Sequence, residues 1–301
     1  MMCAGAVCLN LPHHNTEPYS KGYWDDIISR VNLVENDFSL KAAENFILQN
    51  IEESSKRKRA NEPMGAEKTK ENEYEKYLAL ARSITASSTP SLDGLNKVAE
   101  ERTALYNIDF EGAMHVAFQL LKDSSKVLTD NVPLLMQERD GVVKLTRRQV
   151  ASLLSHMLCC TLVPMSHNKY WVSFEPWLIR DSGPSLAYLL TLLHYFQEFD
   201  KWDDNYKDES VKFHRTVLTP EKTVNWSLCD KPIVKVDVRH GNSIGDREGE
   251  VEVDFANKDV GFGVTGTQEE LLFGMSPELC VAVLISSTLK DDEAFVMEGL
   301  Y

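Results

Sequence analysis

The chain has 301 residues, of which 43% are hydrophobic and 26% charged, a composition typical of a folded globular protein with a substantial core. The length fits one large domain or two smaller ones. The formal net charge of −14 disfavours an electrostatic grip on nucleic acid, because general nucleic-acid binders carry a basic face.

Neither a membrane span nor a disulfide framework is expected. No run of 18 apolar residues occurs, and the mildly apolar N-terminal segment lacks the basic start of a signal peptide. The six cysteines form no Cys-x-x-Cys pair, and Cys159 and Cys160 lie in an apolar helical run typical of core thiols. A reducing compartment, nuclear or cytoplasmic, is therefore predicted.

Residues 1–53 are predicted to form an N-terminal helical segment with two helices, at 23–34 and 39–59. A charged flexible linker is predicted over 54–94, because this part of the chain is poor in apolar residues. The basic run from Lys56 to Arg59 has two readings, a nuclear-import patch or a solvated helix end.

Helical periodicity dominates from residue 95 to 200, and a helical accessory domain is predicted over 95–228. Thr146 and Gln149 form a Thr-x-x-Gln capping box ahead of an apolar stripe, and a second helix is expected over 185–199. His156 and His194 lie in these helices and are predicted to be packed or exposed histidines rather than metal ligands, because no second ligand cluster supports them.

The pattern changes to an α/β unit over 229–301. Alternating valines predict half-buried strands over 232–240 and 250–255, separated by a turn-rich segment. A helix beginning near Ser276-Pro277 and a third strand over 293–301 follow. The unit is expected to be incomplete at its C-terminal end, since three strands make a small sheet.

A loop with Gly261, Gly263 and Gly266 connects the second of these strands to a helix start. Backbone amides of such a loop can bind a phosphate or diphosphate, because glycine lets the backbone approach closely. A dinucleotide-binding fold also has this spacing, but it needs an acidic residue at the end of the next strand. Asp291 and Asp292 precede the third strand instead, which disfavours that fold.

Glu269 and Glu270 follow the loop at the helix start, where the helix dipole stabilises carboxylates. Adjacent glutamates are usually a solvated surface pair. Here an apolar run follows them, so one is expected to be partly enclosed, with the raised pKa of a group that acts as acid and then base. Glycoside cleavage needs this sequence of proton transfers.

The stretch VDFANKDVGFGVTGTQEELLFGMSPEL, residues 253–279, resembles the signature of the poly(ADP-ribose) glycohydrolase family. The similarity extends upstream through the helical segments to about residue 130. It implies an α/β fold class, with a mostly helical N-terminal region followed by a partial macrodomain-like unit. It also implies hydrolysis of ribose–ribose bonds in poly(ADP-ribose), and a role in the DNA damage response.

The resemblance implies roles for individual residues. Glu270 would be the catalytic acid/base, Glu269 would orient the substrate ribose, and Asp254 would complete this catalytic group in the ribose pocket. The residues implied to bind other parts of the substrate are Asn257, Gln268, Gly261, Gly263 and Ile244, the last with Gly245 or Asp246 at the adenine. No cofactor and no metal are implied. The implied partners are poly(ADP-ribose) and poly(ADP-ribosyl)ated proteins, with no membrane and no sequence-specific nucleic acid.

Three departures from the family pattern leave an alternative open. The chain stops after its third predicted strand, whereas the family's macrodomain continues, so the resemblance implies a unit that is incomplete at its C-terminal end. Phe262 interrupts the glycine triplet and is expected to hinder diphosphate binding, so that Phe262→Gly would tighten affinity. The loop from Gly261 to Gln268 is also about three residues shorter than usual in the family, and small displacements matter to catalysis. The alternative is a truncated, catalytically impaired paralogue that acts as a weak ADP-ribose binder or as a helical interaction protein.

Overall fold

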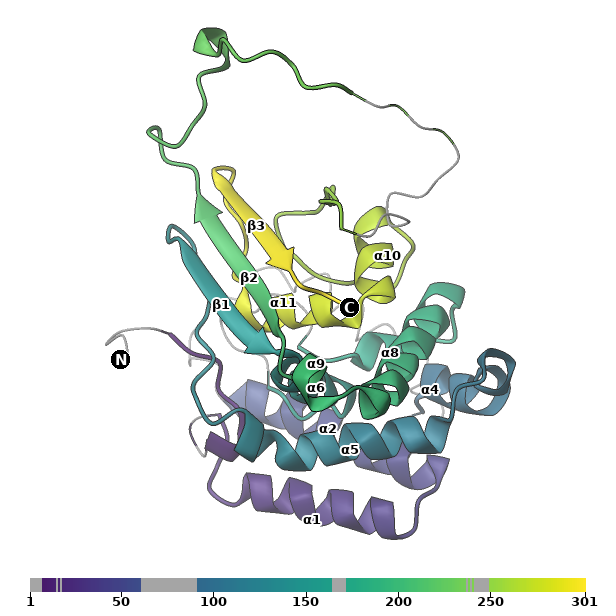
Figure 1. Cartoon of the computed structure of the whole chain (residues 1–301). Helices are drawn as coiled ribbons and strands as arrows, with labels where there is room; N and C mark the ends of the chain where they lie inside the picture. The colour runs from purple at the N-terminus through teal and green to yellow at the C-terminus, as the bar shows by residue number, and fades with distance from the viewer. Residues whose placement is uncertain are drawn as a thin grey trace.

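The computed structural model describes residues 7–14, 16, 18–60, 91–163, 172–236, 238, 240 and 249–301. Helices fill one half of the molecule and a small sheet lies in the other (Figure 1). The long helices are α1 (Tyr23–Asn36), α2 (Leu40–Ala60), α5 (Phe110–Val127), α6 (Arg147–Leu158) and α8 (Gly183–Lys201).

The remaining helical elements are short. They are η1 (Pro12–His14), α4 (Asp93–Lys97), η2 (Val98–Arg102), η3 (Ala104–Tyr106), α7 (Glu175–Leu178), α9 (Asp204–Lys207), η4 (Trp226–Leu228), α10 (Gln268–Met275), η6 (Pro277–Val281) and α11 (Ala282–Ile285). The helical stretch from η6 to α11 confirms the predicted helix at Ser276-Pro277.

The predicted helices at 23–34, 39–59 and 185–199 are present as α1, α2 and α8, and the helix predicted after the Thr146 capping box is present as α6. The capping box at the start of α6 is confirmed, because the Thr146 hydroxyl accepts from the Gln149 amide and the Gln149 side chain accepts from the Thr146 amide. The predicted apolar stripe of α6 is completely buried, in the centre of the helical half.

Helix α2 corrects the predicted start of the linker, because residues 54–60 continue the helix. The Arg57 guanidinium lies 4.0 Å from the centre of the Tyr23 ring and donates to the Pro18 carbonyl. Packing against α1 therefore keeps this part of the chain helical despite its polar composition. Residues 61–90 lie outside the described residues.

The sheet is antiparallel, in the order β1 (Gly141–Thr146), β2 (Ser210–Val217), β3 (Glu293–Glu298). Phe213 of β2 is opposite Val143 on one side and opposite Met297 on the other. The predicted third strand is confirmed as β3. Its partner β2 lies before residue 229, so the sheet joins the helical accessory region to the C-terminal unit.

The predicted half-buried strands over 232–240 and 250–255 are wrong for the described residues, which form no strand. Val234, Val236, Val251 and Val253 are all exposed. From the end of β2, residues 218–236 run away from both the sheet and the helices (Figure 1). Alternation predicts a strand only where a neighbouring strand and a core face are available, and the described residues offer neither there.

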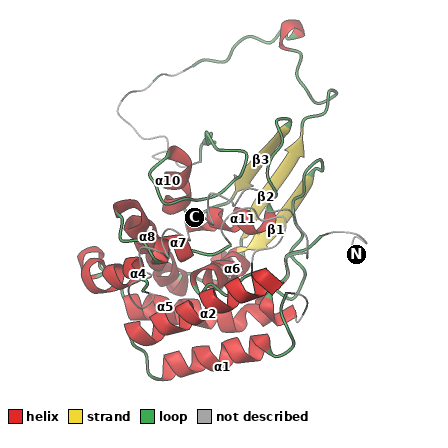
Figure 2. Cartoon of the chain, turned by 180° about the vertical axis from the view of Figure 1, so that it is seen from behind, coloured by secondary structure: helices red, strands yellow, loops and turns green. Residues whose placement is uncertain are grey.

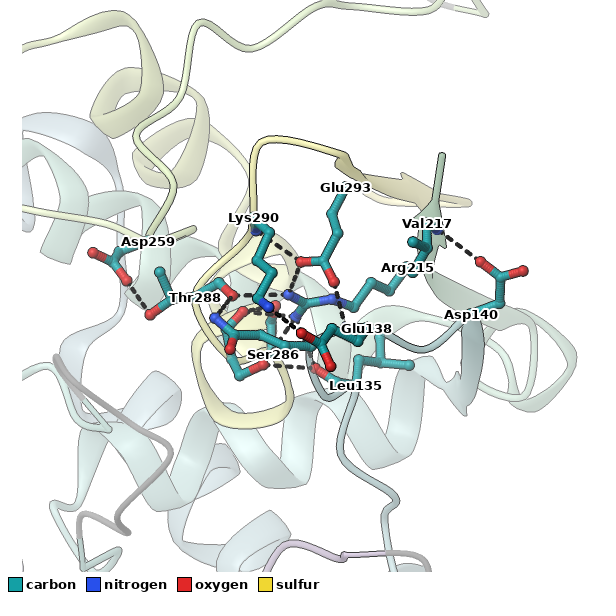
Figure 3. A network of polar contacts seen from close by, with 12 residues as sticks. Leu135, Glu138, Asp140, Arg215, Val217, Asp259, Ser286, Thr288, Lys290 and Glu293 are labelled. Carbon is teal, nitrogen blue, oxygen red and sulfur yellow. Dashed lines mark hydrogen bonds and ion pairs between the residues drawn. The ribbon is translucent and has the colours of Figure 1, made fainter. Parts of the chain in front are cut away.

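Arg215 of β2 lies at the centre of a network of polar contacts between the sheet and the segments that follow α11 (Figure 3). Its buried guanidinium forms an ion pair with Glu293 and donates to the carbonyls of Leu135, Ser287 and Thr288. These contacts fix the turn between α11 and β3. The Thr288 hydroxyl in turn donates to Asp259, which holds the chain just before the glycine loop.

A second buried network holds the other end of β3. The Glu278 carboxylate of η6 accepts from Arg147 of α6 at 2.6 Å, from the Tyr195 hydroxyl of α8 at 3.1 Å, and from the Tyr301 amide at 2.8 Å. Arg147 also donates to the Gly299 carbonyl. One carboxylate therefore joins two core helices to the C-terminal unit.

Candidate active site

The glycine loop and the glutamate pair lie where α10 meets α7 and α8 (Figure 2). Thr267 caps α10 with a complete capping box: its hydroxyl accepts from the Glu270 amide, and the Glu270 carboxylate accepts from the Thr267 amide at 3.0 Å. Glu269 and Glu270 therefore occupy the second and third positions of the helix, at its positive end.

Glu269 faces the glycine loop. One of its carboxylate oxygens accepts from the Gly261 amide at 3.1 Å, and the other accepts from the Asn257 amide at 3.3 Å. Burial nevertheless raises the pKa of Glu269 to about 7, with small additions from the charges of Asp254 and Glu270. The raised pKa makes this carboxyl easier to protonate near neutral pH than an ordinary glutamate.

Glu270 has the opposite surroundings. Burial alone would raise its pKa, but hydrogen bonds from the Thr265 hydroxyl and from the Thr267 amide and hydroxyl outweigh burial and lower the pKa. The side chain also lies against Gly263, where a β-carbon would be 1.9 Å from a Glu270 oxygen. Only glycine at position 263 leaves room for this arrangement.

Gln268 holds the extended segment 253–255 beside α10. Its side chain accepts from the Phe255 amide at 2.9 Å and donates to the Val253 carbonyl at 3.3 Å. Between these two residues, one carboxylate oxygen of Asp254 is buried without a hydrogen-bond partner. Burial and the charge of Glu252 raise the pKa of Asp254. A buried acceptor without a donor is suited to a ligand hydroxyl.

The structure brings most of the predicted site residues together in this small region. These are Asp254, Asn257, Gly261, Gly263, Gln268, Glu269 and Glu270. The Gly261 amide, predicted to bind a diphosphate, donates to Glu269 in this arrangement. The predicted adenine contacts Ile244, Gly245 and Asp246 lie outside the described residues.

Phe262 does not lie where its bulk predicts. Its side chain is buried against Phe174 and Trp177, with ring centres 5.2 and 4.9 Å away, so it occupies the protein core and not the ligand side of the loop. The prediction that Phe262 clashes with a diphosphate is therefore wrong, because its ring fills a position in the protein core.

Four further residues hold the site and were not singled out from the sequence. Thr265 and Thr267 bind Glu270, and Thr267 with Glu270 is a recognisable Thr-x-x-Glu capping pattern. Trp177 and Tyr188 donate to loop carbonyls from the helical region. No sequence signal points to these two, because they lie some eighty residues upstream in ordinary helical patterns.

The donor set of the site is oxygen-rich, but it shows no arrangement for a metal. Within the described residues, no group of three His, Cys, Asp or Glu side chains could hold a metal ion. In the same part of the chain, no helix is both long and apolar enough to cross a membrane.

The chain has a helical region joined to an α/β unit, with a glycine loop and paired glutamates at the junction. These features are those of a macrodomain-like protein with a helical accessory domain. Residues 110–215 match the family profile of the helical domain of poly(ADP-ribose) glycohydrolase, and residues 223–301 match that of its macro domain fold. The chain belongs to the poly(ADP-ribose) glycohydrolase family.

Curated relatives agree with this assignment. Poly(ADP-ribose) glycohydrolase 2 of Caenorhabditis elegans is 28% identical over 163 residues, which cover 49% of this chain and 31% of the relative. Poly(ADP-ribose) glycohydrolase 1 of Arabidopsis thaliana is 24% identical over 203 residues, covering 64% and 36%. Poly(ADP-ribose) glycohydrolase 1 of C. elegans is 31% identical over 158 residues, covering 50% and 20%. The match thus spans about a third or less of each relative.

Proposed function

We propose that this chain is a glycosidase that hydrolyses the ribose–ribose bonds of poly(ADP-ribose) and releases ADP-ribose. Family membership supports the substrate class. The observation that carries the proposal is the placement of two adjacent carboxyl groups, Glu269 and Glu270, against the glycine loop and near a buried oxygen of Asp254 that has no hydrogen-bond partner. Their surroundings shift the two pKa values in opposite directions, so the two groups can take different roles in a glycosidase.

In the proposed reaction Glu270 transfers protons twice. Its carboxyl group donates a proton to the glycosidic oxygen as the bond to the anomeric carbon breaks. The resulting carboxylate then takes a proton from the water that attacks the anomeric carbon, which restores the starting state. Glu269 accepts hydrogen bonds from ribose hydroxyls, and so does the unpartnered oxygen of Asp254. Asn257 and Gln268 line the same pocket, and the amides at Gly261 and Gly263 approach the diphosphate.

The pKa values favour a second assignment, in which Glu269 is the proton donor. A carboxyl group with a pKa of about 7 is partly protonated at neutral pH, whereas Glu270 accepts three hydrogen bonds as a carboxylate. For Glu270 to act as the acid, bound substrate must displace some of the donors from Thr265 and Thr267. The rates of Glu269→Gln and Glu270→Gln separate the two assignments.

Binding without cleavage is the alternative function, and the donors around Glu270 favour it. Hydrogen bonds that lower the pKa of Glu270 keep it ionised, without a proton to donate, and the site would then bind ADP-ribose without hydrolysis. Incubating the purified chain with a protein that carries poly(ADP-ribose) tests the two functions. Release of ADP-ribose supports the glycosidase, and calorimetric binding of ADP-ribose without release supports the binder.

The proposed partners are poly(ADP-ribose) and proteins that carry it, in the nucleus or the cytoplasm. Cys159, Cys160 and Cys280 are buried thiols without disulfides, which fits these reducing compartments. The residues of the basic run that the structure describes are partly used in packing, because Arg57 contacts Tyr23 and Lys56 pairs with Glu52. The nuclear-import reading of this run therefore remains a proposal.

A further inference from the structure

Two side chains of the helical region donate hydrogen bonds directly to the glycine loop. The indole N–H of Trp177, in α7, donates to the Gly263 carbonyl at 2.6 Å. The hydroxyl of Tyr188, in α8, donates to the Thr265 carbonyl at 2.6 Å. Both distances are short for their types of donor, and the two carbonyls are on either side of Val264.

Both donors are held rigidly. The side chains of Trp177 and Tyr188 are 1% and 4% exposed, and their ring centres are 5.2 Å apart. Phe174 stacks on the Trp177 ring at 4.7 Å. A β-carbon at Gly274 of α10 would lie 2.1 Å from the Tyr188 ring, so α10 rests directly on that ring. The helical region therefore fixes both the loop and the helix that carries the glutamates.

The two loop residues whose carbonyls are held, Gly263 and Thr265, both also contact Glu270. Gly263 provides the space that the Glu270 carboxylate occupies, and the Thr265 hydroxyl donates to that carboxylate. A shift of either loop peptide changes the position of Glu270. The contacts thus form a continuous path from Trp177 and Tyr188, through the loop, to one carboxylate.

We propose that Trp177 and Tyr188 are positioning residues for Glu270, and that the helical region thereby forms a working part of the active site. This inference rests on the proposed glycosidase function. Neither side chain needs to touch the substrate. Each acts by holding one carbonyl, which keeps the loop in the one arrangement that leaves Glu270 in place.

Variants that keep the ring and remove the donor test this proposal against simple core packing. Tyr188→Phe removes one hydroxyl, and Trp177→Phe removes the indole N–H at the cost of some volume. Tyr19→Phe is the matched control, because it also removes one buried tyrosine hydroxyl, and the hydrogen bond of that hydroxyl is with the Val163 amide and not with the loop. The readouts are kcat and KM on poly(ADP-ribose), thermal midpoint, and hydrogen exchange of residues 261–267.

For Tyr188→Phe we expect amide exchange across 261–267 to become about tenfold faster, the order expected when one ordinary hydrogen bond is lost. We expect kcat to fall by about 10- to 100-fold with little change in KM, because a misplacement near 1 Å can cost ~10²-fold in rate. Trp177→Phe should act in the same direction. Tyr19→Phe should change neither loop exchange nor kcat.

The proposal is overturned if loop exchange in Tyr188→Phe equals that of the unaltered chain, or if Tyr19→Phe lowers kcat as much. If the unaltered chain releases no ADP-ribose, the proposed function fails separately, and loop exchange still decides whether the two donors hold the loop. Should Trp177→Phe fail to fold, Tyr188→Phe gives the same decision, because it removes a single oxygen atom.

Discussion

The phenyl ring of Phe262 lies 4.9 Å from the indole ring of Trp177, centre to centre, at an interplanar angle of 54°. Phe262 occupies the middle of the glycine triplet, and Trp177 belongs to the helical region. The contact turns the one large side chain of the loop into the core. The Phe262 ring is therefore part of the core and does not project from the loop into solvent.

Removing the Phe262 ring is expected to destabilise the protein and weaken ligand binding. Phe262→Ala should lower the free energy of unfolding by about 3–5 kcal/mol, the usual cost of truncating a buried phenylalanine. ADP-ribose affinity, measured by calorimetry, should fall because the loop loses its anchor. Phe255→Ala is the control, since the Phe255 ring is 76% exposed and its loss should leave unfolding nearly unchanged. Tighter binding by Phe262→Ala would show that the ring obstructs the ligand after all.

Breaking the buried pair of Arg147 and Glu278 is expected to cost far more than breaking an exposed pair on the same helix. Arg147→Met leaves the Glu278 carboxylate buried, and should lower the free energy of unfolding by about 3–5 kcal/mol. Arg148→Met removes pairs with Asp204 and Asp208, which are largely exposed, and should cost less than about 1 kcal/mol. Urea unfolding of the two variants measures the difference. Equal losses would contradict the assignment of Glu278 as a structural centre.

Acid is expected to destabilise the helical region through His156. This side chain is completely buried, its ring nitrogens contact the hydroxyls of Thr161 and Ser124, and the Trp24 ring and the charges of His13 and His14 are near. Burial lowers the pKa of His156 from 6.5 to about 3. Between these values the unfolded chain binds the proton and the folded chain does not, so stability falls as the pH falls.

The expected loss between pH 6.5 and pH 5 is about 2 kcal/mol for this one group, at about 1.4 kcal/mol for each pH unit. Urea unfolding at both pH values measures it. His156→Gln should flatten the dependence, although the variant is less stable at every pH. His194→Gln, a change at a largely exposed ring, should keep the full dependence. A dependence that survives in His156→Gln would assign the acid sensitivity to other groups.

The rate is expected to fall as the pH rises above the pKa of Glu269, which is about 7. The proposed reaction needs one proton on the pair, with Glu269 ionised and Glu270 protonated, and the pair loses that proton above pH 7. Because the opposite placement of the proton gives the same pH profile, the rate of Glu269→Gln decides between the two assignments. If Glu270 is the proton donor, Glu269→Gln keeps part of the rate, whereas a loss as large as that in Glu270→Gln would identify Glu269 as the donor.

The helices and the glutamate site were predictable because their signals are local. A capping box followed by an apolar stripe determined α6, and the loop and glutamates are contiguous from Gly261 to Glu270. β1 and β2 were missed because they lie inside a stretch dominated by helical patterns. The alternating valines near 234 and 251 predicted strands that the described residues do not form, since a strand depends on partners that no local pattern specifies.

The direction of Phe262 and the roles of Trp177 and Tyr188 were beyond the sequence for a similar reason. A phenylalanine in a glycine loop can point either to the ligand or to the core, and only the packing of α7 against the loop decides. The opposite pKa shifts of Glu269 and Glu270 likewise depend on which backbone amides and hydroxyls reach each carboxylate. The sequence predicts that Glu269 and Glu270 lie together, but only the fold shows that their pKa values shift in opposite directions.

The proposed glycosidase function of Glu270 is tested most directly by the rate of ADP-ribose release from a protein that carries poly(ADP-ribose). The rate is measured for the unaltered chain and for Glu270→Gln, and release by the unaltered chain is expected. In the variant the rate should be lower by about 10²–10⁴-fold, the usual contribution of general acid–base catalysis, with ADP-ribose binding nearly unchanged. Equal rates in the two proteins would remove Glu270 from the mechanism, and no release by the unaltered chain would contradict the glycosidase function itself.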